Sequence, residues 1–219
     1  MSQITTKTHT QTKEKYEVKT IVGLESLEEL KKVKDFVSKV YTESGYSHSS
    51  WKNINYDPWS TWFYVEDSNE ILAAMRIIEK KPENVIPLEV AVVWGQPPLK
   101  QYKVKEENVA DWNSVSFLPT SKSGRACTIL FKSVAKHCLD KNYSMVYGMY
   151  NPDSKGIERI YFRAGVSHSQ KYPDLMYFPG FYLNGEFCQF RVIEIRKESL
   201  QKITSYIGYI EYIVFSTLT

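Results

Sequence analysis

The spacing of apolar residues along the chain predicts two long amphipathic helices. In residues 27–41 and again in residues 124–138, apolar side chains recur every three or four positions, which is the period of a helix with one buried face. Ser26, with Glu29 three positions later, predicts a capping box at the start of the first helix. Gly45 is expected to end that helix, because glycine readily adopts the left-handed conformation that follows a helix.

Shorter runs of aliphatic and aromatic residues predict strands between and after these helices. Residues 67–70 form a polar turn of hairpin length between two of the runs. A third helix is expected over about residues 151–164, with Gly165 after its end. The expected strands cover residues 16–22, 61–66, 71–79, 88–94, 111–118, 143–150 and 186–196.

This order of elements, without internal repeats, predicts one mixed α/β domain over residues 16–219. Residues 1–15 are polar and predict a disordered tail. They contain no apolar core of a signal peptide, and the apolar stretch at residues 203–218 is too short and too mixed for a bilayer span. We therefore expect a cytoplasmic protein without integral membrane association.

Composition narrows the classes of function. A net charge of +3 is too small to argue for a nucleic-acid partner. The three cysteines and four histidines lack metal-ligand spacing, so we expect no metal site and reduced thiols. The 16 tyrosines, 10 phenylalanines and 5 tryptophans suit the wall of a pocket for an organic ligand.

The stretch PTSKSGRA at residues 119–126 stands directly before the second long helix. A helix N-terminus carries unpaired N–H groups and about half a positive charge, so it receives phosphate well. Gly124 permits close approach of a ligand to the backbone, and Lys122 and Arg125 add charge. The alternative that these residues leave open is a solvated loop before an ordinary helix. The spacing is neither that of a P-loop nor that of a GxGxxG loop.

The element order around this loop resembles that of the GNAT acyltransferase superfamily. In that superfamily the loop Arg/Gln-x-x-Gly-x-Gly/Ala holds the pyrophosphate of coenzyme A. Gly124 and Ala126 match its last two positions, and Ser121 replaces the arginine or glutamine. The segment from Tyr161 to Gly165 is similar to the family's Tyr-x-x-x-Gly-Phe segment. The resemblance implies a coenzyme A thioester as co-substrate.

One branch of the superfamily is nearest in pattern. Residues 74–78 (AMRII) and 86–89 (IPLE) are similar to the G-T-x-R-L … L-P-x-E run of acyl-homoserine lactone and N-acyl amino acid synthases. Residues 113–115 lie where that branch often has Glu-x-Ser-Arg, and the arginine is absent. The resemblance covers about residues 16–196. It implies a GNAT-like central sheet, mostly antiparallel and twisted, with helices on both faces.

The resemblance implies an N-acyltransferase that moves an acyl group, long chains included, from an acyl thioester to a small-molecule amine. The donor is acyl-CoA or a thioester on acyl carrier protein. Two alternatives stay open. One is an acetyl-CoA-dependent transferase of small acyl groups, and the other is a catalytically silent ligand-binding module with the same fold.

Three residues are candidates for catalysis. Tyr161 matches the family's general-acid tyrosine, and the alternative is a tyrosine that packs its helix against the sheet. The attacking amine must lose a proton, for which Asp111 and Glu89 are the candidate bases. The alternative for each carboxylate, and the one that its position favours, is a solvated group at the end of a strand.

The ligand-binding residues follow from the same resemblance and from the position of the aromatics. Coenzyme A is expected against Phe117, Leu118, Ser121, Lys122, Ser123, Gly124, Arg125 and Ala126, with the first two supplying backbone N–H groups to the oxyanion. The acyl and acceptor groups are expected against Trp51, Trp59, Trp62 and Arg76. Tryptophans in a loop, such as Trp51 and Trp59, are otherwise difficult to explain.

Overall fold

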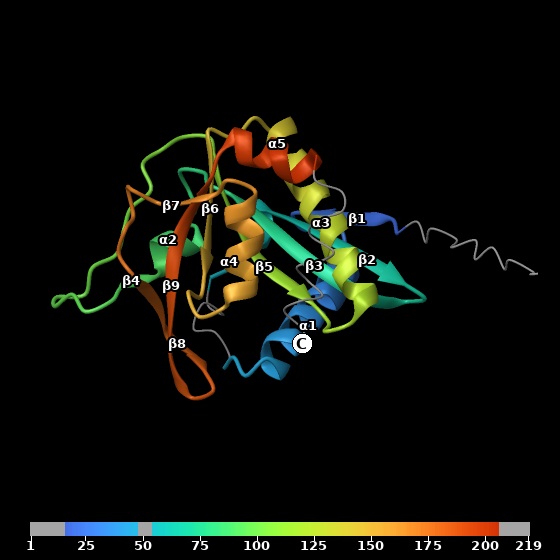
Figure 1. The fold of residues 1–219 in the computed structure, drawn as a ribbon, viewed down its shortest axis with the longest axis horizontal. Coiled ribbons are helices and arrows are strands. Elements are labelled where there is room, and N and C mark those ends of the chain that lie inside the picture. Colours follow the sequence, from blue (N-terminus) through green and yellow to red (C-terminus); the bar gives the residue numbers. More distant parts are fainter. Residues whose placement is uncertain (1–15, 48–53, 206–219) are drawn as a thin grey trace, which may run out of the picture.

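The structure, a computed structural model, describes residues 16–47 and 54–205 (Figure 1). The expected disordered tail at residues 1–15 lies outside these residues and stays a prediction. Within the described residues, nine strands form one sheet in the order β1-β2-β3-β5-β6-β9-β8-β4, with β7 paired to β9. The strands are β1 (Val18–Val22), β2 (Ser60–Asp67), β3 (Glu70–Glu79), β4 (Val92–Val93), β5 (Val109–Phe117), β6 (Met145–Tyr150), β7 (Ser167–His168), β8 (Met176–Leu183) and β9 (Glu186–Ile195).

Strand pairing is antiparallel throughout this sheet except between β5 and β6, which run parallel. The predicted hairpin between β2 and β3 is present. Ser68 and Asn69 both adopt positive φ at its turn, as the tight turns of hairpins require. The mostly antiparallel sheet that the sequence resemblance implied is therefore confirmed.

Helices cover both faces of the sheet, as the family resemblance implied. Along β2, alternate side chains point to opposite faces. Phe63 and Val65 pack in a core with α3, α4 and α5, and Trp62 and Tyr64 pack beneath α1. The helices are α1 (Leu27–Glu43), α2 (Pro87–Val90), α3 (Ser121–Asp140), α4 (Lys155–Arg163) and α5 (Lys197–Ser205), with a 3-10 turn η2 (Asp57–Trp59).

A third core lies under the other half of the sheet. Ile86 and Leu88 from α2 and its flank pack there against Met176 and Phe178 of β8 and Val192 of β9. Each such fully buried aliphatic or aromatic side chain contributes roughly 1.5–3 kcal/mol. This core fixes the β8–β9 hairpin against the sheet, and the hairpin forms one wall of the site described below.

Two local predictions were wrong. Residues 88–94 do not form one strand, because Pro87 begins the short helix α2 and the Glu89 carboxylate accepts the backbone N–H of Ile86 at 3.1 Å. Only Val92–Val93 is extended. The capping box of the first helix is also absent: Ser26 occupies the N-cap position without a side-chain hydrogen bond to the helix.

Helix α3 begins at Ser121, three residues before the predicted start. The hydroxyl oxygen of Thr120 accepts the backbone N–H of Ser123 at 3.1 Å, and this cap extends the helix into the expected loop. Strand β8 and helix α5 were not predicted. In β8 the sequence Pro179-Gly180 interrupts the strand pattern, with Gly180 at φ 80° and a register shift against β9.

Candidate active site

The parallel strands β5 and β6 separate partway along their length. Their last paired residues are Trp112 and Gly148, although β5 continues to Phe117 and β6 to Tyr150. Beyond this pair the facing edges of the two strands are not joined in the described structure. Unpaired strand edges offer backbone N–H and C=O groups to an extended ligand. The split is therefore a place where a linear chain can bind between two strands.

A β-bulge in β5 lies directly after the split. Ala74 of β3 pairs with Ser116 and Arg76 pairs with Asn113, so two residues of β5 stand opposite one residue of β3. Ser114, inside the bulge, adopts a positive φ of 54°. Bulges bend a strand and redirect its side chains. Here the bulge lies beside the split, and the polar residues Asn113 and Ser114 at the bulge line the cavity.

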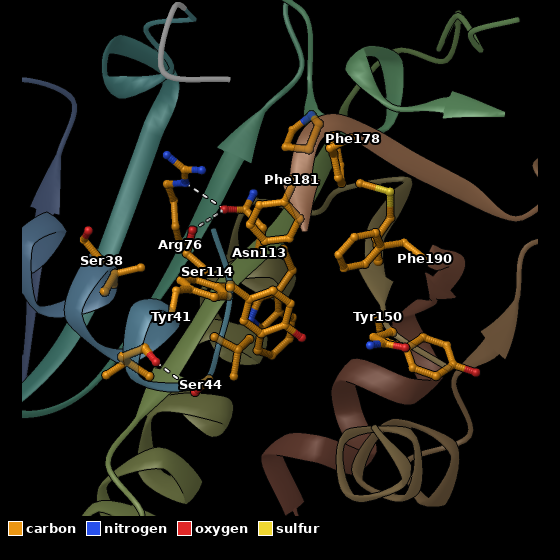
Figure 2. A pocket seen from close by; sticks show the side chains of 18 of the residues that line it. Ser38, Tyr41, Ser44, Arg76, Asn113, Ser114, Tyr150, Phe178, Phe181 and Phe190 are labelled. Carbon is orange, nitrogen blue, oxygen red and sulfur yellow. Dashed lines mark hydrogen bonds between the residues drawn. The ribbon is translucent and has the colours of Figure 1, made fainter. Parts of the chain in front are cut away.

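A cavity of about 900 Å³ opens at this split, which is the size of a site for a drug-sized ligand. Its wall comes from α1, β3, β5, the end of β6, the start of α4 and the β8–β9 hairpin. Figure 2 shows Arg76, Asn113 and Ser114 together on one side, and Phe178 and Phe190 on the other. The cavity thus has a polar side and an aromatic side.

The polar side contains a chain of hydrogen bonds. The Arg76 Nε–H donates to the amide oxygen of Asn113 at 2.7 Å. The Asn113 amide nitrogen donates to Oδ1 of Asp111 at 2.7 Å. The Ser114 hydroxyl donates to the amide oxygen of Asn113 at 2.9 Å. One amide therefore connects a guanidinium and a carboxyl in the wall of the cavity.

Asp111 is a buried carboxyl of the site with a strongly raised pKa. It is 1% exposed, and burial raises its pKa to about 7, against the opposing effects of the Asn113 hydrogen bond, the Arg76 charge and the Leu88 backbone. Its second oxygen, Oδ2, has no hydrogen-bond partner in the described structure. A general base works best with a pKa near the working pH. Asp111 combines that property with a buried, unbonded oxygen at the wall of the cavity.

Arg76 lies between two aromatic rings. The carbon of its guanidinium is 5.4 Å from the ring centroid of Tyr56 and 4.9 Å from that of Trp62. Burial lowers the pKa of Arg76 from its ordinary value, but an arginine stays charged in proteins. The rings hold the guanidinium in place by cation–π attraction. Arg76 and Trp62, both predicted to contact substrate, do line the cavity.

Tyr161 reaches the same cavity from α4. Its ring packs edge-on against Trp112, with centroids 6.5 Å apart, and against Phe131 at 5.9 Å. Burial raises the pKa of Tyr161 above that of an exposed tyrosine, so it is a weaker acid than the sequence interpretation assumed. The structure brings Tyr161 and Asp111 to one cavity.

Glu89, the second predicted base, lies elsewhere. Its oxygens accept the backbone N–H groups of Ile86 and Val104, each at 3.1 Å, and it pairs with Lys80 at 2.9 Å. It is not among the residues that line the cavity. Its contacts give it a structural role in holding α2 and the segment before β5.

Two of the predicted tryptophans do not contribute to the cavity wall. Trp51 lies outside the described residues, so its role stays a prediction. Trp59, in η2, packs against the core beneath α2 and does not line the cavity.

The predicted coenzyme A loop is the first turn and a half of α3. The Ser123 N–H donates a hydrogen bond to the Thr120 hydroxyl oxygen, and the Lys122 ammonium forms an ion pair with Asp67. Of the predicted residues here, Ser123, Gly124 and Ala126 are buried, Lys122 and Arg125 are partly buried, and Ser121 is exposed. The helix start therefore offers less free capacity for phosphate than a bare loop.

The segment that leads into α3 borders the cavity directly. Phe117 and Pro119 line it, and Leu118 between them is partly buried. A ligand that follows the open edge of β5 therefore reaches the start of α3. The predicted contacts at Phe117 and Leu118 stay compatible with this geometry.

Several residues of the site escaped the sequence reasoning. Asn113 was noted only for its departure from the family pattern, although its spacing of two from Asp111 places both on one face of a strand. The aromatic wall lies in or beside β8, which was not predicted. Its rings form a cluster with centroids 5.1 to 6.4 Å apart, made by Tyr46, Phe178, Phe181 and Phe190.

Among the described residues, no group of three or more histidine, cysteine, aspartate or glutamate side chains could hold a metal ion. No helix among them is both long and apolar enough to span a bilayer.

Similar folds occur among solved structures, although no family model and no curated protein matches the chain. FeeM, an N-acyl amino acid synthase from uncultured soil microbes, is 12% identical with a TM-score of 0.58, covering 85% of this chain and 98% of its own. BjaI, a CoA-dependent acyl-homoserine lactone synthase, is 15% identical with a TM-score of 0.54, covering 89% and 90%. A probable acetyltransferase from Staphylococcus epidermidis is 8% identical with a TM-score of 0.52, covering 82% and 98%.

At these identities the likeness concerns the fold. The architecture of this chain corresponds over most of its length, and over most of theirs, to that of these three solved structures. The fold that the sequence resemblance implied is therefore the one the chain shares with these solved structures.

Proposed function

We propose that the protein is an N-acyltransferase that moves an acyl group from a thioester to the amine of a small molecule. The observation that carries this proposal is a buried carboxyl with a pKa of about 7, Asp111, in the wall of a large cavity at the split between two parallel strands. Solved structures that share the fold include an N-acyl amino acid synthase and a CoA-dependent acyl-homoserine lactone synthase, which supports the same class of reaction.

The donor lies along the open edge of β5. A pantetheine arm is a linear chain with two amides, and the unpaired edge beyond Trp112 supplies partners for them. Backbone N–H groups near Phe117 and Leu118 stabilise the oxyanion. The phosphates of coenzyme A lie at the start of α3, where Lys122 and Arg125 add positive charge. Acyl carrier protein presents the same thioester arm and is the alternative donor.

Proton transfer centres on Asp111. The amine nitrogen attacks the thioester carbonyl carbon, a C–N bond forms, and Oδ2 of Asp111 takes the proton from that nitrogen. When the C–S bond breaks, the thiolate recovers this proton from Asp111. The second transfer is downhill, because a thiol has a pKa of about 8.5 and the pKa of Asp111 is about 7. Tyr161, whose burial raises its pKa, donates a hydrogen bond to the sulfur and keeps its proton.

Each side of the cavity binds one of the two substrates. The acceptor lies on the polar side, with an anionic group held by the Arg76 guanidinium, which suits planar, bidentate recognition. The acyl group lies against the aromatic cluster of Phe178, Phe181 and Phe190. Burial of methylenes against these rings favours a chain longer than acetyl.

The test measures release of free thiol and formation of amide. The protein is incubated with acetyl-, octanoyl- or palmitoyl-CoA, or with octanoyl-loaded acyl carrier protein, and a mixture of amino acids and polyamines. Mass spectrometry identifies the amide. We expect thiol release with at least one donor, and strongly reduced release in Asp111→Asn. Tight binding of a donor without thiol release from any of them would contradict the proposal and favour the silent binding module.

A further inference from the structure

Asn113 stands between two opposite charges. Arg76 of β3 and Asn113 of β5 are directly paired residues in the antiparallel ladder, and Asp111, which pairs with Ile78, is the next residue on the same face. A diagonal neighbour in such a ladder is within reach of a long side chain. Even so, no ion pair within 4 Å joins Arg76 to Asp111 or to another carboxylate among residues 16–47 and 54–205. The guanidinium instead bonds to the Asn113 amide oxygen at 2.7 Å.

The direction of the amide is fixed by three hydrogen bonds. Its oxygen accepts from the Arg76 Nε–H and from the Ser114 hydroxyl, and its nitrogen donates to Oδ1 of Asp111. A flipped amide would point its N–H groups at the Nε–H and would lose the bond to the carboxyl, so the network permits one orientation. The bulge at Ser114, with φ of 54°, holds this side chain where the three bonds meet.

We propose that Asn113 is a positioning residue that prevents a salt bridge between Arg76 and Asp111. By occupying Nε of Arg76, it leaves the two terminal NH₂ groups of the guanidinium to the acceptor. By bonding Oδ1 of Asp111, it leaves Oδ2 to the proton of the amine. A salt bridge would make both groups less available to the acceptor. A paired carboxylate is a weak base, and a paired guanidinium binds a second anion poorly. The proposal rests on the proposed function for its catalytic meaning.

Arg76 is the one permanent charge among the groups that face Asp111 in the described structure. The other titratable groups that surround the carboxyl are phenols: Tyr56, from the segment before η2, and Tyr161 from α4. From α2 only the Leu88 backbone acts on the carboxyl. Burial is the main cause of the raised pKa of Asp111, and a direct ion pair with Arg76, which Asn113 prevents, would act against it.

Two substitutions of Asn113 should move the titration of Asp111 in opposite directions. In Asn113→Leu the Nε–H loses its acceptor, so Arg76 turns to Asp111, and an adjacent opposite charge lowers a carboxyl pKa by about one to three units. Loss of the Asn113 hydrogen bond acts in the opposite direction, and the direct ion pair is expected to outweigh it. In Asn113→Asp, which has the same shape, the new carboxylate pairs with Arg76 and repels the charge on Asp111, so the pKa of Asp111 rises. A residue that merely filled space would not produce opposite signs.

The experiment is a pH titration of the Asp111 carboxyl by ¹³C NMR in protein labelled at aspartate, with the resonance assigned by its loss in Asp111→Asn. We expect the midpoint to fall by at least one pH unit in Asn113→Leu and to rise in Asn113→Asp. Ser114→Ala is the matched control, because it removes a bond to the same oxygen but keeps both links to the charges. Its midpoint should stay near that of the wild type. Equal midpoints in all four proteins would overturn the proposal.

The titration needs no substrate, so its outcome is independent of the proposed function. If the midpoints move as expected and no donor releases thiol, the proposed reaction fails while the spacing role of Asn113 stands. Where turnover is measured, the acidic limb of kcat/KM against pH should follow the same two directions. The KM for the acceptor should rise and the KM for the donor should stay constant. Lost turnover with an unmoved pH profile would contradict the role of Asn113.

Discussion

Asp111→Asn should make the protein more stable at alkaline pH while it removes the catalytic base. Burial raises the pKa of Asp111 from 3.8 to about 7, so between these values the folded chain holds a proton that the unfolded chain has lost. The free energy of unfolding therefore falls as the pH rises through this window. About three pH units separate the values and each is worth about 1.4 kcal/mol, which gives roughly 4 kcal/mol in full. Asparagine never carries this charge.

The assay is urea unfolding of wild type and Asp111→Asn at pH 5 and pH 8. The quantity compared is the difference in free energy of unfolding between the two proteins, since the other titrating groups cancel in it. Asp111→Asn should exceed the wild type by roughly 1–2 kcal/mol at pH 5 and by roughly 4 kcal/mol at pH 8. Asp140→Asn, at an exposed ion pair with Lys136, is the control and should change stability by less than about 1 kcal/mol.

A difference that stays constant between pH 5 and pH 8 would refute the reasoning, because it would mean that Asp111 ionises alike in the folded and unfolded chains. The same variant should lose about 10²- to 10⁴-fold in turnover, the usual effect of removing a general base. If Asp111→Asn is both more stable and less active, the ionisable carboxyl of Asp111 serves activity and lowers the stability of the fold.

Four further predictions concern catalysis and the binding of the donor. Tyr161→Phe should lower turnover about ten- to hundredfold, the worth of one hydrogen bond to a developing charge, with the donor KM unchanged; steady-state kinetics would show a packing role if turnover stayed within about twofold. Lys122→Glu with Arg125→Glu should weaken coenzyme A binding several-fold to about a hundredfold, and unchanged affinity by calorimetry would remove the start of α3 from the site. In competition, a donor with four more buried methylenes than acetyl-CoA should be preferred by about a hundredfold, since each contributes about 0.8 kcal/mol. A preference for acetyl-CoA would favour the small-acyl alternative, and Phe181→Ala should reduce the preference for the long chain.

The sequence predicted those helices and strands in which the spacing of apolar residues matches the side chains that are buried. Helix α1 has one buried face, with Leu30, Val33 and Val37 inside, and β2 and β3 are joined by a polar turn, so pattern and structure agree. Prediction failed where a local hydrogen bond or a proline competes with the pattern. Glu89 turns the expected strand into α2, and Thr120 extends α3 into the expected loop.

Part of the candidate site was also within reach of the sequence. Asp111, Tyr161 and Arg76 could be named because strand spacing and the family resemblance place them near the split. A gap between the two central strands is implied by the family resemblance alone, because no residue pattern marks the end of the β5–β6 pairing or the bulge at Ser114. The role of Asn113 depends on a partner 37 positions away in the sequence, and such a contact is created only by the pairing of β3 with β5.

A crystal structure of the complex with S-octyl coenzyme A would test the central claim most directly. This thioether resembles an octanoyl donor but cannot transfer its chain. The account predicts that its sulfur lies at the split beyond Trp112 and Gly148, within reach of Tyr161 and Asp111, with the octyl chain against Phe178 and Phe190. A ligand bound outside the split would contradict the account. So would a ligand that fills the cavity while the Asp111 carboxyl faces neither its sulfur nor the open space beside the sulfur.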